Sequence, residues 1–416
     1  MTVLTRRAAL RALAGSTGLA AFGGPAFAAE TFDINVGALY PMSGPNAAIG
    51  ENANNALRSA LEIVEGDYDL DLPLARADHL PGIPGARLKY LLSDHKGDPA
   101  TARAAAARLI TENKVIALIG CGDEKIAEVL TEVCDKSGVA FIDTDSNAQS
   151  LRQRPSQFSF RFATDEAIRA ATLFDFFDHL RQDAKADVRS IALLHDKEPD
   201  DIRAAQMLRA AAMGRKTAIT AEAPHLRGRA DQSRTAAEKL RQEVDAIILI
   251  GSAHDSMELA ALVADAAKGA PLICYPASTL DRVIGQAPES GQGLFFMKGF
   301  ARDIRDNDPN IAAINTLYRS FGHRDLDELA ALQFTGFLTL AFAINEARNA
   351  SPAKIAQRLG AVDQAGNRTI MPWERLIFDG KGQNTGAGVV LSQRQGDRLA
   401  TVFPGKLATA IAHWKA

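Results

Sequence analysis

Carboxylate side chains recur at one kind of position in this sequence, just after predicted strands. Seven acids lie within a few residues of a strand's carboxyl end: Asp123, Glu124, Asp143, Asp145, Asp196, Asp200 and Asp255. In open α/β sheets these strand ends meet at one edge, where ligands bind. A carboxylate with satisfied hydrogen bonds can hold an ammonium group there. The pattern therefore predicts a zwitterionic or cationic ligand.

A purely structural role competes with that interpretation. Aspartate is a preferred helix N-cap, and acids in a first turn complement the helix dipole. Three of these acids stand where predicted helices begin, namely Asp123, Asp200 and Asp255. Asp98 stands at the start of another predicted helix. The free N–H groups of the same helix starts would favour a carboxylate on the ligand. Both interpretations stay open on sequence alone.

Three further candidate ligand contacts lie at or near the ends of predicted strands. They are Tyr40, Ser43 and Tyr275.

Motifs of the common enzyme classes are missing from the sequence. It has no G-x-S-x-G elbow, H-E-x-x-H, C-x-x-C or P-loop, and the glycines at 120 and 122 lack the third one of a dinucleotide fingerprint. Alternating acids at Asp143–Asp145 and Asp67–Asp71 lack the rest of an EF-hand loop, which leaves a cation site as a weak alternative. We expect no catalysis, no cofactor and no assigned metal site.

Strands and helices alternate along the chain, which is typical of βαβ units and parallel sheets. The predicted strands are Phe32–Tyr40, Leu88–Ser93, Val115–Ile119, Val139–Ile142, Ser190–Leu194, Thr217–Ala221, Ala246–Ile250 and Leu272–Tyr275. The predicted helices are Asn46–Glu65, Asp98–Asn113, Asp123–Lys136, Pro199–Met213, Gln232–Glu243 and Asp255–Ala267. Val115–Gly120 matches Ala246–Gly251, and this internal similarity indicates two lobes of one architecture.

The last third of the chain changes character. It is predicted to hold an extended stretch, three helices and a β-rich tail: Leu294–Phe300, Ile311–Phe321, Leu326–Asn349, Pro352–Leu359, Trp373–Phe378 and Gly388–Val402. Several passages of one chain between two lobes would form a hinge, and a hinge predicts closure around a ligand.

The N-terminus has the features of an export signal. Arg6, Arg7 and Arg11 precede a weakly apolar stretch, and Ala26–Ala28 supplies the small-x-small cleavage pattern. The paired arginines are typical of the twin-arginine type. We predict residues 1–28 to be a signal peptide cleaved after Ala28 and the mature protein to be periplasmic. No later stretch is expected to be long and apolar enough to span a membrane.

Composition narrows the function further. The 416 residues are 47% hydrophobic, with 47 basic and 50 acidic residues and a net charge of −3, so a nucleic-acid partner is not expected. The three cysteines, Cys121, Cys134 and Cys274, are an odd number for an oxidising compartment. About 20 Å of predicted helix separates the first two, so we expect all three to be buried and unpaired.

Six segments follow one another in an order that is typical of a known family: Ile34–Pro45, Ser93–Pro99, Arg108–Ile110, Val115–Gly120, Phe160–Arg161 and Trp373–Gly382. In this ordered set of segments the chain resembles the leucine/isoleucine/valine-type solute-binding proteins of ABC transporters. The resemblance implies an α/β fold of type I periplasmic binding protein architecture, with two Rossmann-like lobes, parallel sheets and a multi-strand hinge. We assign lobe 1 to 29–160 plus 298–385 and lobe 2 to 161–297 plus 386–416.

The resemblance also implies where a ligand binds. In that family, lobe 1 contacts it through hydroxyls and backbone amides after two successive strands, which here are the positions of Asp123, Glu124, Lys125, Asp143, Asp145, Ser146 and Asn147. In lobe 2, aromatic residues often stand near the positions of Asp200 and His254, and a carboxylate that holds the ligand's ammonium stands near Ala277. Asp200 and Ala277 depart from that pattern, which argues against a branched-chain amino acid.

The function implied is capture of a small polar solute, an amino acid or a related amine or amide. The partners would be that solute and the ABC permease membrane subunits, with no nucleic acid and a monomer as the default. Two alternatives remain on the same fold, a sensory ligand-binding module and a periplasmic metal-cation binder.

Overall fold

The protein was analysed as a computed structural model, which describes residues 31–146, 151, 155–183, 186–196, 198–224, 234–235, 238, 240, 244–251, 270–275 and 293–414. The chain divides into two compact units. Unit 1 comprises Met1–Ala163 and Pro309–Gly386, and unit 2 comprises Thr164–Asp308 and Ala387–Ala416. The expected boundary at 297/298 falls inside a strand, Phe295–Lys298, that belongs to the sheet of unit 2. Residues 298–308 belong with unit 2: Lys298 pairs with Val390 of β13, and Asp303 accepts hydrogen bonds from Thr401 and Thr409.

Unit 1 is built on a five-stranded sheet in the order β2-β1-β3-β4-β5, in which every pairing is parallel. Its strands are β1 (Phe32–Tyr40), β2 (Ala86–Asp94), β3 (Ala117–Gly120), β4 (Ala140–Asp143) and β5 (Ser159–Arg161). The last residues of four strands pair with one another, Tyr40 of β1 with Asp94 of β2 and Gly120 of β3 with Asp143 of β4. Their carboxyl ends therefore share one edge.

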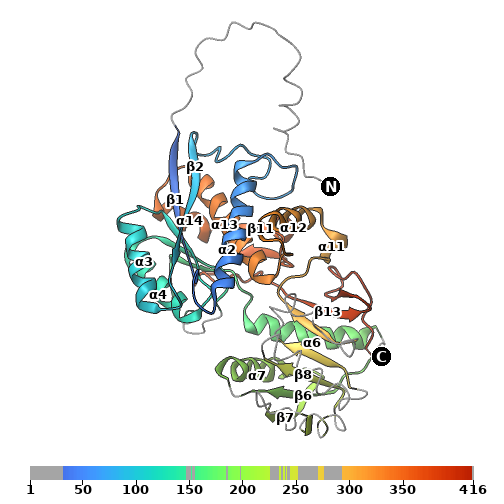
Figure 1. Cartoon of the computed structure of the whole chain (residues 1–416). Coiled ribbons are helices and arrows are strands. Elements are labelled where there is room, and N and C mark those ends of the chain that lie inside the picture. Colours follow the sequence, from blue (N-terminus) through green and yellow to red (C-terminus); the bar gives the residue numbers. More distant parts are fainter. Residues whose placement is uncertain are drawn as a thin grey trace, which may run out of the picture. The chain divides into compact units, whose positions relative to one another are not determined.

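Helices cover both faces of this sheet. They are α2 (Ala47–Glu65), α3 (Pro99–Thr111), α4 (Glu124–Ser137), α12 (Pro309–Gly322), α13 (Glu328–Ala347) and α14 (Pro352–Gly360). Helices α3 and α4 lie together on one side of β1 and β2, with α2 and α13 on the other (Figure 1). A short 3₁₀ turn (Gly366–Arg368) lies between the two-stranded pair β11 (Asp363–Ala365) and β12 (Arg375–Ile377).

Helix α13 is the central helix of unit 1. By length and composition alone it could cross a membrane, contrary to the expectation from sequence, yet 89% of its apolar 18-residue window is buried inside the unit. Gly336 brings it close to β4, since a Cβ there would lie 3.0 Å from Thr144 Cγ2. Its apolar character is therefore that of a core helix.

Unit 2 contains a seven-stranded sheet in the order β14-β13-β10-β9-β8-β6-β7. Its strands are β6 (Ser190–His195), β7 (Ala218–Pro224), β8 (Ala246–Ile250), β9 (Leu272–Tyr275), β10 (Phe295–Lys298), β13 (Val390–Gln395) and β14 (Arg398–Phe403). The five neighbouring strands β7, β6, β8, β9 and β10 pair in parallel. Strand β13 pairs antiparallel with β10, and β14 pairs antiparallel with β13. This sheet is thus mixed, whereas the sequence predicted parallel sheets. The described helices of this unit are α6 (Glu166–Gln182), α7 (Pro199–Ala212) and α11 (Ile304–Asn307).

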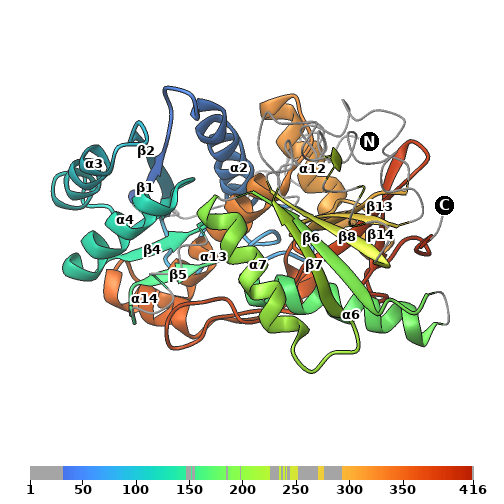
Figure 2. The same cartoon turned by 90° about the horizontal axis from the view of Figure 1, so that it is seen from below.

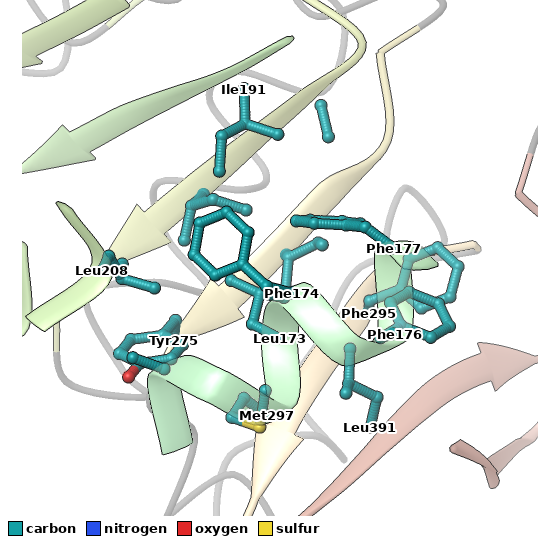
Figure 3. Close-up of a cluster of buried hydrophobic side chains, with 14 of the residues drawn as sticks. Leu173, Phe174, Phe176, Phe177, Ile191, Leu208, Tyr275, Phe295, Met297 and Leu391 are labelled. Atoms are coloured by element: carbon teal, nitrogen blue, oxygen red, sulfur yellow. The ribbon is translucent and has the colours of Figure 1, made fainter. Parts of the chain in front are cut away.

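Aromatic packing forms the core of unit 2. Helix α7 packs along β6, β7 and β8 (Figure 2) and against α6. From α6, the rings of Phe174, Phe176 and Phe177 point into a cluster that includes Tyr275 and Phe295 (Figure 3). Each of these five side chains is buried. Burial of such rings is a large apolar contribution, about 1.5–3 kcal/mol for each fully buried side chain.

Most predicted elements are confirmed, with ends shifted by a few residues. Helix α6 and strand β5 were not predicted. The buried face of α6 includes two charged residues, Glu166 and Arg169, which interrupt the apolar periodicity that marks an amphipathic helix. The predicted helices Gln232–Glu243 and Asp255–Ala267 lie wholly or mostly outside the described residues. The three cysteines are buried and unpaired, as expected.

Candidate functional site

Asp123 lies directly after β3 and begins helix α4. Its Oδ1 accepts hydrogen bonds from the backbone N–H groups of Lys125 (2.8 Å) and Ile126 (3.1 Å). These are two of the N–H groups that a helix start leaves without an intrahelical partner. The N-cap interpretation of Asp123 is thus confirmed, and the half-buried Glu124 opens the helix beside it.

Asp145 lies in the turn after β4 and reaches the loop after β3. Its Oδ1 accepts the N–H of Gly122 at 2.8 Å and that of Cys121 at 3.4 Å. Its Oδ2 accepts the Nε2 of Gln333, from α13, at 3.4 Å. Gly122 has φ +83°, and a Cβ there would lie 2.9 Å from Ile49 Cγ2, so the loop conformation that aims its N–H at Asp145 favours glycine.

Asp143, the last residue of β4, is fully buried. Its Oδ1 accepts the N–H of Ser146 at 3.0 Å, and its Oδ2 accepts the Ser146 hydroxyl. Burial raises the pKa of Asp143 to about 7, and the nearby charge of Asp145 adds to this, while the Ser146 hydrogen bonds act in the opposite direction. Burial also raises the pKa of Asp145. A buried carboxyl costs less free energy when protonated, which is the cause in both cases.

Tyr40 and His95 lie near the carboxylates of Asp143 and Asp145 and the loop after β3. Both side chains are fully buried. The Tyr40 hydroxyl lies 3.4 Å from Thr144 Oγ1, and burial raises its pKa well above the usual range. His95 Nδ1 accepts the N–H of Gly97 at 3.0 Å, so Nε2 carries the proton and donates to the Cys121 carbonyl at 3.0 Å. His95 therefore ties the end of β2 to the loop after β3.

Ser43 joins a separate network at the end of β1. Its hydroxyl donates to Asp94 Oδ2 at 2.6 Å, and Asp94 Oδ1 accepts the N–H groups of Met42 and Lys96 at 2.9 and 2.8 Å. Desolvation acts to raise the pKa of Asp94, but these hydrogen bonds outweigh it and lower the pKa. Ser43 is exposed, so this network lies at the surface.

In unit 2 the predicted contacts do not come together in the described part of the chain. Asp200 lies in the first turn of α7, with a side chain 75% exposed and ion-paired to Arg203. Tyr275 ends β9 with its ring in the core, and its hydroxyl oxygen lies at the edge of the cluster (Figure 3). Burial raises the pKa of that hydroxyl, and the nearby carboxylate of Glu166 adds to this.

Two of the predicted contacts, Asn147 and His254, lie outside the described residues. Asp123, Asp143, Asp145 and Ser146 are brought together, and Tyr40 is linked to them through Thr144. The sequence analysis missed Gln333. A polar residue inside the otherwise apolar stretch 328–347 was the signal that could have found it. The role of each of these residues in ligand binding stays a prediction.

The arrangement presents oxygen atoms that can accept hydrogen bonds. Among the residues that the structure describes, no group of three or more His, Cys, Asp or Glu side chains is placed to hold a metal ion. Calcium, by comparison, takes six to eight oxygen ligands.

A comparison with protein-family models identifies the family of this chain. The model of the periplasmic binding protein family matches residues 33–391, which span both units. The chain belongs to the periplasmic binding protein family.

This periplasmic binding protein is similar to curated relatives at low identity. It is 24% identical over 165 residues to Leu/Ile/Val-binding protein homolog 3 of Brucella melitensis, and that match spans only 40% of either chain. It is 22% identical over 413 residues to Leu/Ile/Val-binding protein homolog 7 of Brucella suis, covering 90% of this chain and 92% of the relative. The second comparison thus covers most of both chains.

Solved structures share its fold. One is the branched-chain amino acid transporter substrate-binding protein of Streptococcus pneumoniae in complex with isoleucine, with TM-score 0.68, 18% identity, and coverage of 88% of this chain and 98% of the other. Another is a solute-binding protein of an ABC transporter from R. palustris in complex with benzoate, with TM-score 0.65, 16% identity, and coverage of 92% and 97%. The type I periplasmic binding architecture predicted from sequence is confirmed.

Proposed function

We propose that this periplasmic binding protein is the exported solute-binding component of an ABC transporter, which captures a small polar solute and delivers it to permease subunits in the membrane. The observation that carries the proposal is the family match at 33–391, because it extends from β1 to the start of β13 and so includes strands from the sheets of both units. The relatives named for Leu, Ile and Val binding support an amino acid or a related amine or amide.

The strand ends of unit 1 support this function chemically. Open α/β sheets bind ligands outside the carboxyl ends of their strands, and that edge here carries Asp123, Asp145 and Ser146. The oxygens of Asp123 and Asp145 are fixed by hydrogen bonds from the backbone, and the Ser146 hydroxyl donates to Asp143. Fixed polar groups at a strand edge can orient a small solute without the catalytic groups that a reaction would need.

The test is a melting-temperature screen of residues 29–416 against amino acids, amides, polyamines, aromatic carboxylates and metal ions. A solute at 100 times its Kd stabilises the folded protein by about 2.7 kcal/mol, which is a shift of a few degrees. We expect a shift with at least one organic solute. Shifts confined to metal ions and reversed by a chelator would favour the cation-binding alternative, and no shift in any class would contradict the proposal.

A further inference from the structure

Five backbone N–H groups at the strand ends of unit 1 donate hydrogen bonds to the chain's own carboxylates. Asp145 takes those of Cys121 and Gly122 after β3. Asp123 accepts the N–H groups of Lys125 and Ile126 in the first turn of α4. Asp143 accepts the N–H group of Ser146 after β4. Such N–H groups are what binds an anion at a helix start. An incoming carboxylate would have to displace an internal carboxylate of the same charge.

We infer that the solute presents a protonated amine to unit 1, not a carboxylate, at an acceptor site formed by Asp145 and Gln333. This rests on the proposed function and narrows its solute class. Of the ligands in the two solved structures described above, isoleucine carries such an amine and benzoate does not.

Gln333 provides the observation that is independent of the acids. Its side chain is fully buried, and its Nε2 faces Asp145 Oδ2 at 3.4 Å. Its Oε1 has no hydrogen-bond partner among the described residues. Rotating the amide would set Oε1 against the carboxylate, so the acceptor stays unsatisfied in either orientation. Leaving a buried acceptor unpaired costs about 1–3 kcal/mol.

An ammonium group matches these acceptors. It has three donors and no acceptor, so one group can serve both Asp145 Oδ2 and Gln333 Oε1. The bond from Gln333 to Oδ2 is long, and Asp145 is only half-buried, which leaves this oxygen able to accept a stronger donor.

The basic side chains near Asp145 make their described contacts with other groups. The guanidinium of Arg161, whose charge acts on Asp143, donates to Gln383 Oε1 at 3.1 Å and to the Lys381 carbonyl at 3.0 Å. Lys125 is exposed on α4, and both ring nitrogens of His95 are hydrogen-bonded. None of these contacts gives Asp145 a cationic partner.

The first experiment compares three five-carbon probes, 1,5-diaminopentane, 5-aminopentanoate and glutarate, by titration into glycine-¹⁵N-labelled residues 29–416. The readout is the Gly122 amide resonance, because its proton is bonded to Asp145. We expect the two amines to move this resonance and glutarate to leave it in place. Asp145→Asn keeps an oxygen for the Gly122 N–H but removes the charge, so it should weaken 1,5-diaminopentane binding at least tenfold.

Asp98→Asn is the matched control, since Asp98 caps α3 in the same unit through Thr101 N at 2.7 Å. It should bind the amines like wild type. Equal responses of wild type and Asp145→Asn to 1,5-diaminopentane, including no response from either, overturn the inference, as does a glutarate response alone. If only carboxylates without an amine stabilise the protein in the melting screen, the proposed function stands and this inference alone fails.

Discussion

At the scale of single residues, local sequence predicts some roles of the acids and not others. The cap at Asp98 follows from its place before Pro99 at a helix start, and the structure confirms it. The bonds of Asp145 could not be predicted, because Gly122 and Gln333 lie 23 and 188 residues away in sequence. Which acid faces a backbone amide and which faces solvent depends on such distant contacts.

Asp143→Asn should change the pH dependence of stability. The pKa of Asp143 is raised from 3.8 to about 7, so the folded state keeps a proton that the unfolded chain loses between these values. Wild type therefore loses stability as pH rises through that interval, and the variant lacks this loss. Urea unfolding at pH 4.5 and 7.5 should show the variant gaining roughly 2–4 kcal/mol relative to wild type at the higher pH.

The groups that act on the Asp143 charge are Asp145, Arg161 and Ser146, and all remain in this variant. Asp94→Asn serves as the control, because the pKa of Asp94 is lowered. Its contribution is lost only as pH falls below the unfolded value, so its effect should be constant between pH 4.5 and 7.5. A pH-independent difference for Asp143→Asn would show that Asp143 is ionised throughout.

At the scale of elements, periodicity and capping residues located most strands and helices to within a few residues. The parallel sheet of unit 1 was predictable because its buried strands alternate with amphipathic helices. The antiparallel pairings of β10 with β13 and of β13 with β14 were not, because strand order in a sheet is set by tertiary packing. Helix α13 shows the same limit, since its apolar sequence alone does not distinguish a core helix from a membrane span.

Substitutions at Asp123 can separate its cap role from its charge. Asp123→Ala removes the acceptor for Lys125 N and Ile126 N and should lower the free energy of unfolding by about 1 kcal/mol. Asp123→Ser keeps a capping oxygen without the charge and should restore most of that loss. Urea denaturation of the two variants measures the difference. If Ser proves as destabilising as Ala, the charge of Asp123 matters more than its cap.

At the scale of the whole molecule, function depends on what lies before the fold as well as on the fold. The family match begins at residue 33, just after the predicted cleavage site at Ala28. Residues 1–28 lie outside the described residues, so the export signal rests on sequence pattern alone. Cleavage would remove Arg6, Arg7 and Arg11 and leave a mature net charge of −6. A solute-binding protein can meet its solute and its permease only after that step.

We therefore predict that Arg6→Lys combined with Arg7→Lys retains the protein in the cytoplasm as an uncleaved precursor. The substitution keeps the positive charge of the n-region, so it tests recognition of the arginine pair rather than charge. Cell fractionation with intact-mass measurement checks it: wild type should be periplasmic and begin at Ala29. Arg11→Lys, outside the pair, should be exported like wild type. Normal export of the double variant would assign this signal to the general secretory type and leave the periplasmic location intact.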